Sequence, residues 1–151
     1  MQRKCSMDKY DSMKLENQAC FLLYACSKEI VKLYNPLLDE LNLTYTQYIT
    51  MMVMWEHKKL LVKEIGEYLC LDSGTLTPVL KKLEDKGFLA RTRSKEDERD
   101  VVISITPDGE VLKERALSVP ERLRSCIKFG GEDANKLAEL LKTLLTELMN
   151  R

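Results

Sequence analysis

The periodicity of this sequence changes from helical to strand-like at Gly87, and no other feature restricts the fold as much. Ahead of it, apolar residues recur at helical spacing and few glycines or prolines interrupt them. Asp72 or Ser73 can cap a helix over roughly residues 74–86, which Gly87 closes as a left-handed C-cap. The sequence therefore predicts a short helix with defined ends in the middle of the chain.

Strand-like residues follow that helix immediately. Residues 88–93 alternate loosely between apolar and polar, residues 94–100 form a charged tip, and residues 101–105 are strongly β-branched. This pattern predicts a two-stranded hairpin with a polar tip. Because another candidate helix covers residues 61–69, the order over residues 61–105 is helix, turn, helix, hairpin, which is typical of a winged helix-turn-helix.

Helical segments flank this part on both sides. Before it we expect a helix from residue 11 or 12 to about 34, ended by Asn35 and Pro36, then a short turn at residues 37–41 and a helix over residues 45–57 behind the cap residue Thr44. After it we expect a helix from Thr106 towards Val119 and Pro120 and a last helix over about residues 132–149. The prediction is a single domain over residues 1–151 that is mainly α with a small β-hairpin wing.

The charge balance excludes a strongly basic coat for nucleic acid, although it allows a local basic patch. Lysine plus arginine and aspartate plus glutamate each number 24 in the 151 residues, so the formal net charge is zero. The longest apolar run, residues 19–26, has eight residues and is too short to cross a bilayer. With no apolar region of a secretory signal near the N-terminus, we expect a cytoplasmic protein without a membrane partner.

The same apolar run carries information about packing. Residues 19–26 are apolar on every face of a helix, whereas a surface helix has one apolar stripe. We therefore expect this segment to be covered on all sides, by its own domain or by a partner chain.

The helix before the hairpin carries side chains suited to DNA. Small polar residues at its start suit phosphates and base edges in a major groove, and lysines one to two turns later can neutralise backbone phosphate. These candidate DNA-binding residues are Asp72, Ser73, Gly74, Thr75, Thr77, Lys81 and Lys82. Six basic residues against two acidic ones between Lys81 and Lys95 form a basic stripe, in which we include Lys86.

The tip of the hairpin supplies a further candidate. Arg99 has the reach to enter a minor groove, while its acidic neighbours Glu96, Asp97 and Glu98 stay clear of the DNA or brace it. The alternative is that the polar residues only cap a helix and the charges form a solvated face. The hairpin directly after the helix favours DNA binding, because it supplies a second DNA-binding element in the correct order.

The chain has five widely spaced cysteines without a Cys-x-x-Cys pair: Cys5, Cys20, Cys26, Cys70 and Cys126. With His57 as the single histidine, no clustered ligands are present and we expect no metal. An odd count also argues against a disulfide framework. The residues alone leave inert core thiols or a reactive one. Burial is common for free cysteine, so on residues alone Cys20 is interpreted as a core residue and Cys70 as packing.

A family resemblance is carried by residues 71–110, LDSGTLTPVLKKLEDKGFLARTRSKEDERDVVISITPDGE. This segment resembles the multiple-antibiotic-resistance regulator (MarR) family, for which Asp97-Glu98-Arg99 is highly characteristic. Residues 15–56, LENQACFLLYACSKEIVKLYNPLLDELNLTYTQYITMMVMWE, resemble its organic hydroperoxide resistance regulator (OhrR) branch. The resemblance covers nearly the whole chain and weakens over residues 118–131. One departure is Thr46, where the branch usually has proline, a change that can loosen the start of the helix.

The resemblance implies a homodimeric repressor that binds a pseudo-palindromic operator in double-stranded DNA through residues 61–105. Residues 11–57 and 106–151 then serve dimerisation and sensing. It also implies that an organic hydroperoxide oxidises a thiol in the helical part, after which the repressor releases its operator. No cofactor is implied.

The same resemblance assigns the sensing residues. Cys20 is the peroxide-reactive thiol, Tyr34 and Tyr45 of the opposite subunit hydrogen-bond its sulfur, and Tyr24 lines the same pocket. Hydroxyl donors stabilise the thiolate, which is the nucleophilic form. Cys126 lies close to where two-cysteine members of the branch have a resolving cysteine. One-cysteine members instead cap the sulfenic acid with a low-molecular-weight thiol, and both alternatives stay open.

Two other functions also stay open on the sequence. A regulator of the same fold can be released by a non-covalent ligand such as a phenolic acid, with Cys20 as a bystander. A thiol peroxidase is the alternative from a different class. The chain has no candidate acid-base pair, because His57 beside Trp55 and Glu56 is interpreted as a helix-end residue, so we expect that it is not an enzyme.

Overall fold

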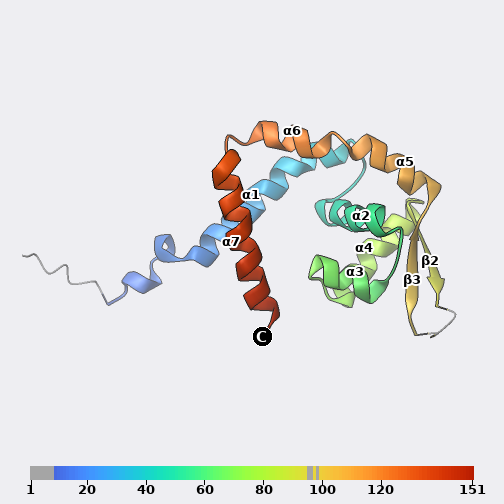
Figure 1. Cartoon of the computed structure of the whole chain (residues 1–151), viewed down its shortest axis with the longest axis horizontal. Coiled ribbons are helices and arrows are strands. Elements are labelled where there is room, and N and C mark those ends of the chain that lie inside the picture. Colours follow the sequence, from blue (N-terminus) through green and yellow to red (C-terminus); the bar gives the residue numbers. More distant parts are fainter. Residues whose placement is uncertain (1–8, 95–96, 98) are drawn as a thin grey trace, which may run out of the picture.

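The computed structural model describes residues 9–94, 97 and 99–151 (Figure 1). The predictions about Cys5, Lys95, Glu96 and Glu98 lie outside these residues. In chain order the elements described are η1 (Asp11–Met13), η2 (Leu15–Asn17), α1 (Ala19–Asp39), α2 (Tyr45–His57), β1 (Lys59–Leu61), α3 (Val62–Leu69), α4 (Ser73–Asp85), β2 (Leu89–Arg93), β3 (Val101–Ile105), α5 (Pro107–Ala116), α6 (Val119–Cys126) and α7 (Gly131–Met149). The predicted class, mainly α with a small hairpin, is confirmed.

Helices α3 and α4 and the small sheet form the winged helix-turn-helix, which lies at one end of the molecule (Figure 1). β2 and β3 are antiparallel, with Leu89 opposite Ile105. The sequence did not predict β1, which pairs with the other side of β3 and places Lys59 opposite Ser104, so that the strand order is β1-β3-β2. A three-residue strand has no periodicity of its own and forms because a distant strand offers it hydrogen bonds.

Helix α2 begins where the sequence predicts, behind a capping box. Thr44 Oγ1 accepts from the Gln47 amide at 3.4 Å, and Gln47 Oε1 accepts from the Thr44 amide at 3.2 Å. Thr46 is the second residue of α2, and its carbonyl accepts from Thr50 Oγ1 at 2.8 Å. The capping box is thus complete with Thr46 in place of the proline that is usual in the branch.

Helix α1 differs from the prediction at both ends. It begins at Ala19, because two 3-10 turns take the place of the helix expected from residue 11. It also continues through Pro36, where we expected an end followed by a separate turn. Proline in a helix interior costs about 3 kcal/mol. The helix continues because Leu37 and Leu38, 7% and 0% exposed, are buried in the core beyond it.

The helix expected from Thr106 towards Pro120 is divided in two. α5 starts at its cap residue Thr106 as predicted and ends at Ala116, and α6 begins at Val119. Pro120 lies in the first turn of α6, where its missing amide hydrogen breaks no helical bond. The break therefore precedes the proline by one turn.

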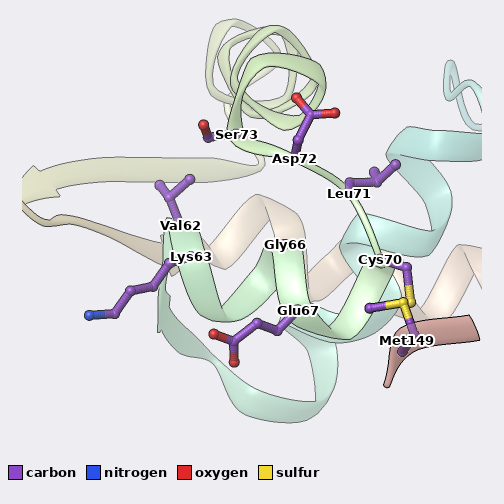
Figure 2. Close-up of a pocket in the computed structure, with 9 residues that line it drawn as sticks. All are labelled: Val62, Lys63, Gly66, Glu67, Cys70, Leu71, Asp72, Ser73 and Met149. Atoms are coloured by element: carbon purple, nitrogen blue, oxygen red, sulfur yellow. The ribbon is translucent and has the colours of Figure 1, made fainter. Parts of the chain in front are cut away.

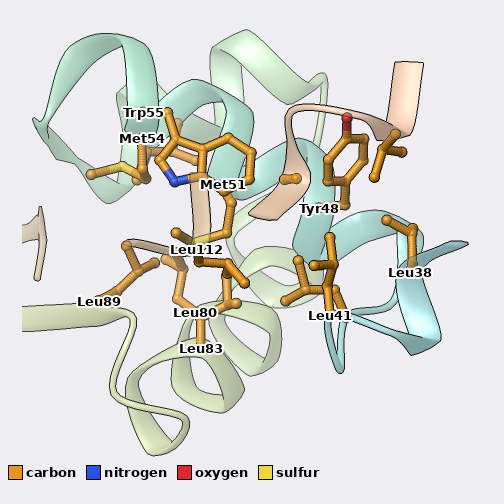
Figure 3. Close-up of a cluster of buried hydrophobic side chains, with 14 of the residues drawn as sticks. Leu38, Leu41, Tyr48, Met51, Met54, Trp55, Leu80, Leu83, Leu89 and Leu112 are labelled. Atoms are coloured by element: carbon orange, nitrogen blue, oxygen red, sulfur yellow. The ribbon is translucent and has the colours of Figure 1, made fainter. Parts of the chain in front are cut away.

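The hydrophobic core lies between α2, α4, the sheet and the start of α5 (Figure 3). Its fully buried side chains include Leu38, Met51, Met54, Ile65, Leu76, Leu80, Leu83, Ile103, Leu112 and Val119. Trp55 is buried in the same cluster and its Nε1 donates to the Gly109 carbonyl at 2.8 Å, which ties α2 to α5. A rigid core thus supports the helix-turn-helix.

The outer helices, in contrast, expose apolar side chains. α7 has no buried residue, and Leu140 is 69% exposed. On α1, Leu22 and Tyr24 are 56% and 63% exposed. Of the two expectations for residues 19–26, coverage by their own domain is therefore wrong. None of the helices described is long and apolar enough to span a membrane.

The four cysteines within the described residues, Cys20, Cys26, Cys70 and Cys126, are all exposed in the single chain. The prediction that most of the cysteines are buried core thiols is therefore wrong for these four. Three of them lie on the outer helices α1 and α6, where the core of a single chain does not extend.

Candidate functional site

The exposed face of α4 carries the residues predicted to bind DNA. The helix buries Leu76, Leu80 and Leu83 against the core. Its opposite face exposes the predicted residues Ser73, Gly74, Thr75, Thr77, Lys81 and Lys82. The amphipathic pattern therefore brings the small polar residues and the two lysines together on one solvent-facing surface.

Asp72, the remaining predicted residue, acts as the N-cap of α4. Its Oδ1 accepts from the Thr75 amide and its Oδ2 from Thr75 Oγ1, both at 2.9 Å. These two hydrogen bonds from Thr75 lower the pKa of the Asp72 carboxyl. A Cβ on Gly74 would lie 3.0 Å from Asp72 Oδ1, so glycine leaves room for the cap. Asp72 thus sets the start of the exposed face through its own hydrogen bonds.

The wing holds Arg99 away from the rest of the chain. Its side chain is 93% exposed, and its Nε lies 3.5 Å from Asp97 Oδ1. The same Asp97 oxygen accepts from the Arg99 amide at 2.9 Å. Asp97 therefore braces the tip, which is one of the two roles expected for the acidic neighbours.

Lys86 does not belong to the basic stripe in which we included it. Its Nζ donates to the Asn42 carbonyl at 2.6 Å and to Gln47 Oε1 at 2.9 Å. Burial, followed by the nearby charge of Lys82, lowers the pKa of Lys86. The ammonium group is directed at α2, because two oxygen acceptors lie there.

The predicted reactive thiol, Cys20, lies in the first turn of α1. Tyr24 follows it by four residues, so the two side chains lie on one face of the helix. Between them Phe21, Leu22 and Leu23 are 37%, 56% and 39% exposed. The surroundings of this thiol within its own chain are therefore apolar and open.

The two tyrosines predicted to contact the thiol form a pair elsewhere. The rings of Tyr34 and Tyr45 lie 4.9 Å apart, joining α1 to the first turn of α2. Burial and the neighbouring Tyr45 and Tyr48 raise the pKa of Tyr34, so its hydroxyl stays protonated and can donate at neutral pH. Fourteen residues separate Cys20 from Tyr34, which is about 21 Å along α1. One chain does not bring the three together.

Tyr48 is a residue of this region that the sequence reasoning missed. Its ring lies 5.8 Å from that of Tyr34 and 6.2 Å from that of Trp55. Its spacing of three residues from Tyr45 on a predicted helix is the signal that identifies it. Tyr48 connects the tyrosine pair to the hydrophobic core.

An apolar groove with a volume of about 690 Å³ lies between α1 and α7. Leu22 and Cys26 line it from α1, Leu140 and Leu144 line it from α7, and Tyr45 lies at its edge from α2. Cys26, to which the sequence assigned no role, is thus part of an apolar surface that both outer helices share.

Cys126 is the last residue of α6, and its Sγ donates to the Arg122 carbonyl at 3.3 Å. Arg122 forms a bidentate pair with Glu40 just beyond α1, with both N–O distances 2.7 Å. Cys20 is twenty residues from Glu40, about 30 Å along the helix. A disulfide requires Cα atoms within about 7 Å, so Cys20 and Cys126 of one chain are too distant to bridge.

A smaller pocket of about 440 Å³ lies beside the turn between α3 and α4 (Figure 2). Cys70 ends α3 at φ 54° and lines this pocket with Met149 from the end of α7. A Cβ on Gly66 would lie 2.7 Å from the Leu71 carbonyl oxygen, so glycine is required for this tight turn. Cys70 is exposed, so its prediction as a packing residue is wrong.

Among the residues described, no three His, Cys, Asp or Glu side chains gather to hold a metal ion.

Together, the exposed face of α4, which is the recognition helix, and Arg99 in the wing define a winged helix-turn-helix DNA-binding protein. A family model described as "Transcriptional regulator SarA/Rot" matches residues 32–116, which include the whole winged helix-turn-helix. The match covers more than half of the chain.

Similar proteins identify the family to which this winged helix-turn-helix protein belongs. The chain is 55% identical over 141 residues to the organic hydroperoxide resistance transcriptional regulator of Bacillus subtilis, covering 93% of this chain and 96% of that protein. At this identity and coverage the chain belongs to the organic hydroperoxide resistance regulators of the MarR family. The family resemblance of the sequence is thereby confirmed.

Solved structures of related proteins have the same fold. Reduced AbfR of Staphylococcus epidermidis bound to DNA is 33% identical, with a TM-score of 0.76 over 94% of this chain and 99% of that chain. The disulfide form of AbfR, also 33% identical, gives a TM-score of 0.65 over 93% of this chain and 96% of that chain. MarR itself, at 23% identity and a TM-score of 0.71 over 86% of this chain and 96% of that chain, supports the fold alone.

Proposed function

We propose that this protein is a homodimeric transcriptional repressor that releases its operator when an organic hydroperoxide oxidises Cys20. The observation that carries the proposal is the separation of about 21 Å between an exposed Cys20 and the Tyr34–Tyr45 pair of the same chain. This separation supports a sensing site whose residues meet across two chains. The name of the relative from Bacillus subtilis supports the organic hydroperoxide as effector.

The apolar faces of α1 and α7 support the dimer. Besides Leu22 on α1, the exposed leucines of α7 are Leu137, Leu140, Leu141, Leu144, Leu145 and Leu148. Each leucine that moves from water into an interface contributes about 1.5–3 kcal/mol, so a second copy covering this surface stabilises it strongly. A two-fold pairing of α1 with the partner's α1 brings Cys20 of one chain towards the tyrosines of the other.

The winged helix-turn-helix of each chain binds one half of a pseudo-palindromic operator. In this arrangement Ser73, Thr75 and Thr77 contact base edges and phosphates in the major groove. Lys81 and Lys82 neutralise phosphate, and Arg99 enters the adjacent minor groove. Asp72 and Gly74 contribute indirectly, by fixing the start of the helix. Double-stranded DNA as the partner also favours the expected cytoplasmic location.

The sensing reaction is a two-electron oxidation of the thiolate. Cys20 Sγ attacks the distal oxygen of the hydroperoxide, the O–O bond breaks, and the alkoxide leaves with a proton as an alcohol. Cysteine sulfenic acid remains. Tyr34 and Tyr45 of the partner subunit donate hydrogen bonds to the sulfur, and Tyr24 lines the apolar approach that favours an organic peroxide. As a regulator rather than a peroxidase, the protein reacts once per chain and then stops.

Two fates of the sulfenic acid remain, and each loses one molecule of water. Cys126 of the partner subunit condenses with it to give a disulfide, or a low-molecular-weight thiol gives a mixed disulfide. We favour Cys126, because a related protein, AbfR, is known in a disulfide form. The bridge must join two chains, since about 30 Å of helix separates Cys20 from the Glu40 that anchors α6 in one chain.

An electrophoretic mobility shift with a candidate inverted repeat tests the function. Wild-type protein should bind before treatment with cumene hydroperoxide and release the DNA afterwards. Cys20→Ser, nearly isosteric and resistant to this oxidation, should bind in both conditions. Release of the DNA by a phenolic acid with Cys20 still reduced would favour the ligand-controlled regulator instead. Continuous turnover of peroxide with a thiol reductant would favour a peroxidase.

A further inference from the structure

Lys86 connects the recognition helix α4 to the start of α2. It follows the last residue of α4 and donates from Nζ to the Asn42 carbonyl at 2.6 Å and to Gln47 Oε1 at 2.9 Å. These acceptors are 44 and 39 residues away in sequence and belong to the loop before α2 and to its first turn. The lysine therefore makes a long-range contact between two elements with different tasks.

Gln47 is the shared element of this contact. It is only 2% exposed, and its Oε1 accepts both from Lys86 Nζ and from the Thr44 amide at 3.2 Å. One buried oxygen thus closes the capping box of α2 and holds the end of α4. Because this oxygen is buried and has two donors, a shift of the Gln47 side chain affects the capping box and the contact with Lys86 together.

Tyr45 of the tyrosine pair lies two residues before Gln47, in the same first turn of α2. Tyr45 follows the cap residue Thr44, and its ring lies 4.9 Å from the ring of Tyr34. A displacement of Tyr45 rotates the first turn of α2, to which Gln47 also belongs. The hydrogen bonds of the capping box convert that rotation into a movement of the Gln47 side chain.

At its other end, Lys86 is fixed to α4 by main-chain bonds. Its amide donates to the Lys82 carbonyl at 3.1 Å, and the amide of Gly87 donates to the Glu84 carbonyl at 2.8 Å. A helix of this length moves as a rigid unit, so a shift at its C-terminal end changes how Thr77 and Lys81 face DNA. The path from the tyrosine pair to the recognition helix therefore runs through the main chain of the first turn of α2 and then through the Gln47–Lys86 hydrogen bond.

We propose that the Gln47–Lys86 hydrogen bond couples the Tyr34–Tyr45 pair to the recognition helix, so that Gln47 and Lys86 are positioning residues for operator release. The inference rests on the proposed function, because it requires that oxidation of Cys20 displaces Tyr45. It adds a route by which the helical sensing part changes the DNA-binding part within one chain.

The test compares the operator Kd of the oxidised and reduced dimers, and the ratio of the two measures the coupling. Lys86→Met keeps the aliphatic stem and removes the donor, Gln47→Met removes the acceptor, and the double variant removes both. Lys82→Met is the matched control, since it removes a positive charge from an exposed position of the same helix. Thermal unfolding and the rate of Cys20 oxidation are measured for every variant. If buried Gln47→Met does not fold, half-buried Lys86→Met carries the test.

We expect Lys86→Met and Gln47→Met to lower the ratio by about fivefold or more, with Cys20 oxidised at the wild-type rate. The double variant should lower it no further than either single change, because both remove the same bond. Lys82→Met should weaken binding in both states and keep the ratio. Folded Lys86→Met with a wild-type ratio would overturn the coupling. A wild-type dimer that keeps its operator after oxidation would instead overturn the proposed function.

Discussion

The ring of Tyr34 lies 4.9 Å from the ring of Tyr45, and this contact fastens α1 to the first turn of α2. Cys20 lies at the opposite end of α1, about 21 Å from Tyr34 along the axis. A single chain therefore keeps thiol and hydroxyl groups apart, while its exposed α1 and α7 faces favour a second copy. In the proposed function the sensing site is therefore shared between the two chains of a homodimer.

Arg99→Ala should weaken operator binding without affecting folding. The side chain is 93% exposed and its ion pair with Asp97 is local, while the hydrogen bond from the Arg99 amide is kept, so the melting temperature should stay unchanged. We expect the operator Kd to rise by about tenfold, equivalent to about 1.4 kcal/mol. Fluorescence anisotropy at physiological salt measures it, and Arg99→Lys should restore part of the loss. An unchanged Kd for Arg99→Ala would show that the wing does not contact DNA.

Lys81→Met or Lys82→Met should reduce the salt dependence of operator binding. Each lysine that contacts phosphate releases about 0.9 counterion, and each substitution occurs twice in a dimer. The slope of log Kd against log salt concentration should therefore fall by about two for either variant. Lys113→Met, on α5, removes the same charge outside the proposed interface. An equal change of slope for Lys113→Met would contradict the assignment of the phosphate contacts.

The cap of the recognition helix should make stability depend on pH in the acid range. Hydrogen bonds from Thr75 lower the pKa of Asp72 in the folded state. A lowered pKa stabilises the folded state above the ordinary aspartate range, and this contribution is lost as the pH falls through the lowered value. Asp72→Asn keeps an acceptor but does not titrate there. The melting temperatures of wild type and variant should converge on acidification; a constant difference down to the acid transition would contradict this account.

Treatment with peroxide in the absence of added thiol should yield a covalent dimer on a non-reducing gel. Cys126→Ser should abolish that dimer and leave Cys20 as a sulfenic acid. Cys26→Ser, which changes a cysteine of the α1–α7 groove, should still form it. A monomer band with Cys20 in a mixed disulfide, seen only when a small thiol is added, would identify the one-cysteine mechanism instead.

Local signals in the sequence predicted the ends of several elements correctly. Asp72, Gly87 and Thr106 each act through hydrogen bonds or backbone angles within a few residues, so their effect can be read from the sequence. The end of α1 at Pro36 was predicted wrongly, because burial of Leu37 and Leu38 by distant elements outweighs the local effect of proline.

The direction of long side chains was harder to predict. Lys86 was assigned to the DNA-facing stripe, but its acceptors Asn42 and Gln47 lie about forty residues earlier in the chain. On residues alone most of the cysteines were interpreted as buried, whereas the four in the described part of the chain are exposed, and in the proposed function a second chain covers Cys20. In both cases the deciding partner is distant in sequence or lies on another molecule.

Heterodimers test directly whether the sensing site joins two chains. In the first, one chain carries Cys20→Ser and the other carries Tyr34→Phe with Tyr45→Phe, so one cysteine still faces intact tyrosines across the interface. In the second, one chain carries all three changes and its partner is wild type, so the remaining cysteine faces only phenylalanines. The rate of thiol loss with cumene hydroperoxide should be wild-type in the first heterodimer and clearly slower in the second. The reverse order would contradict a site shared between subunits.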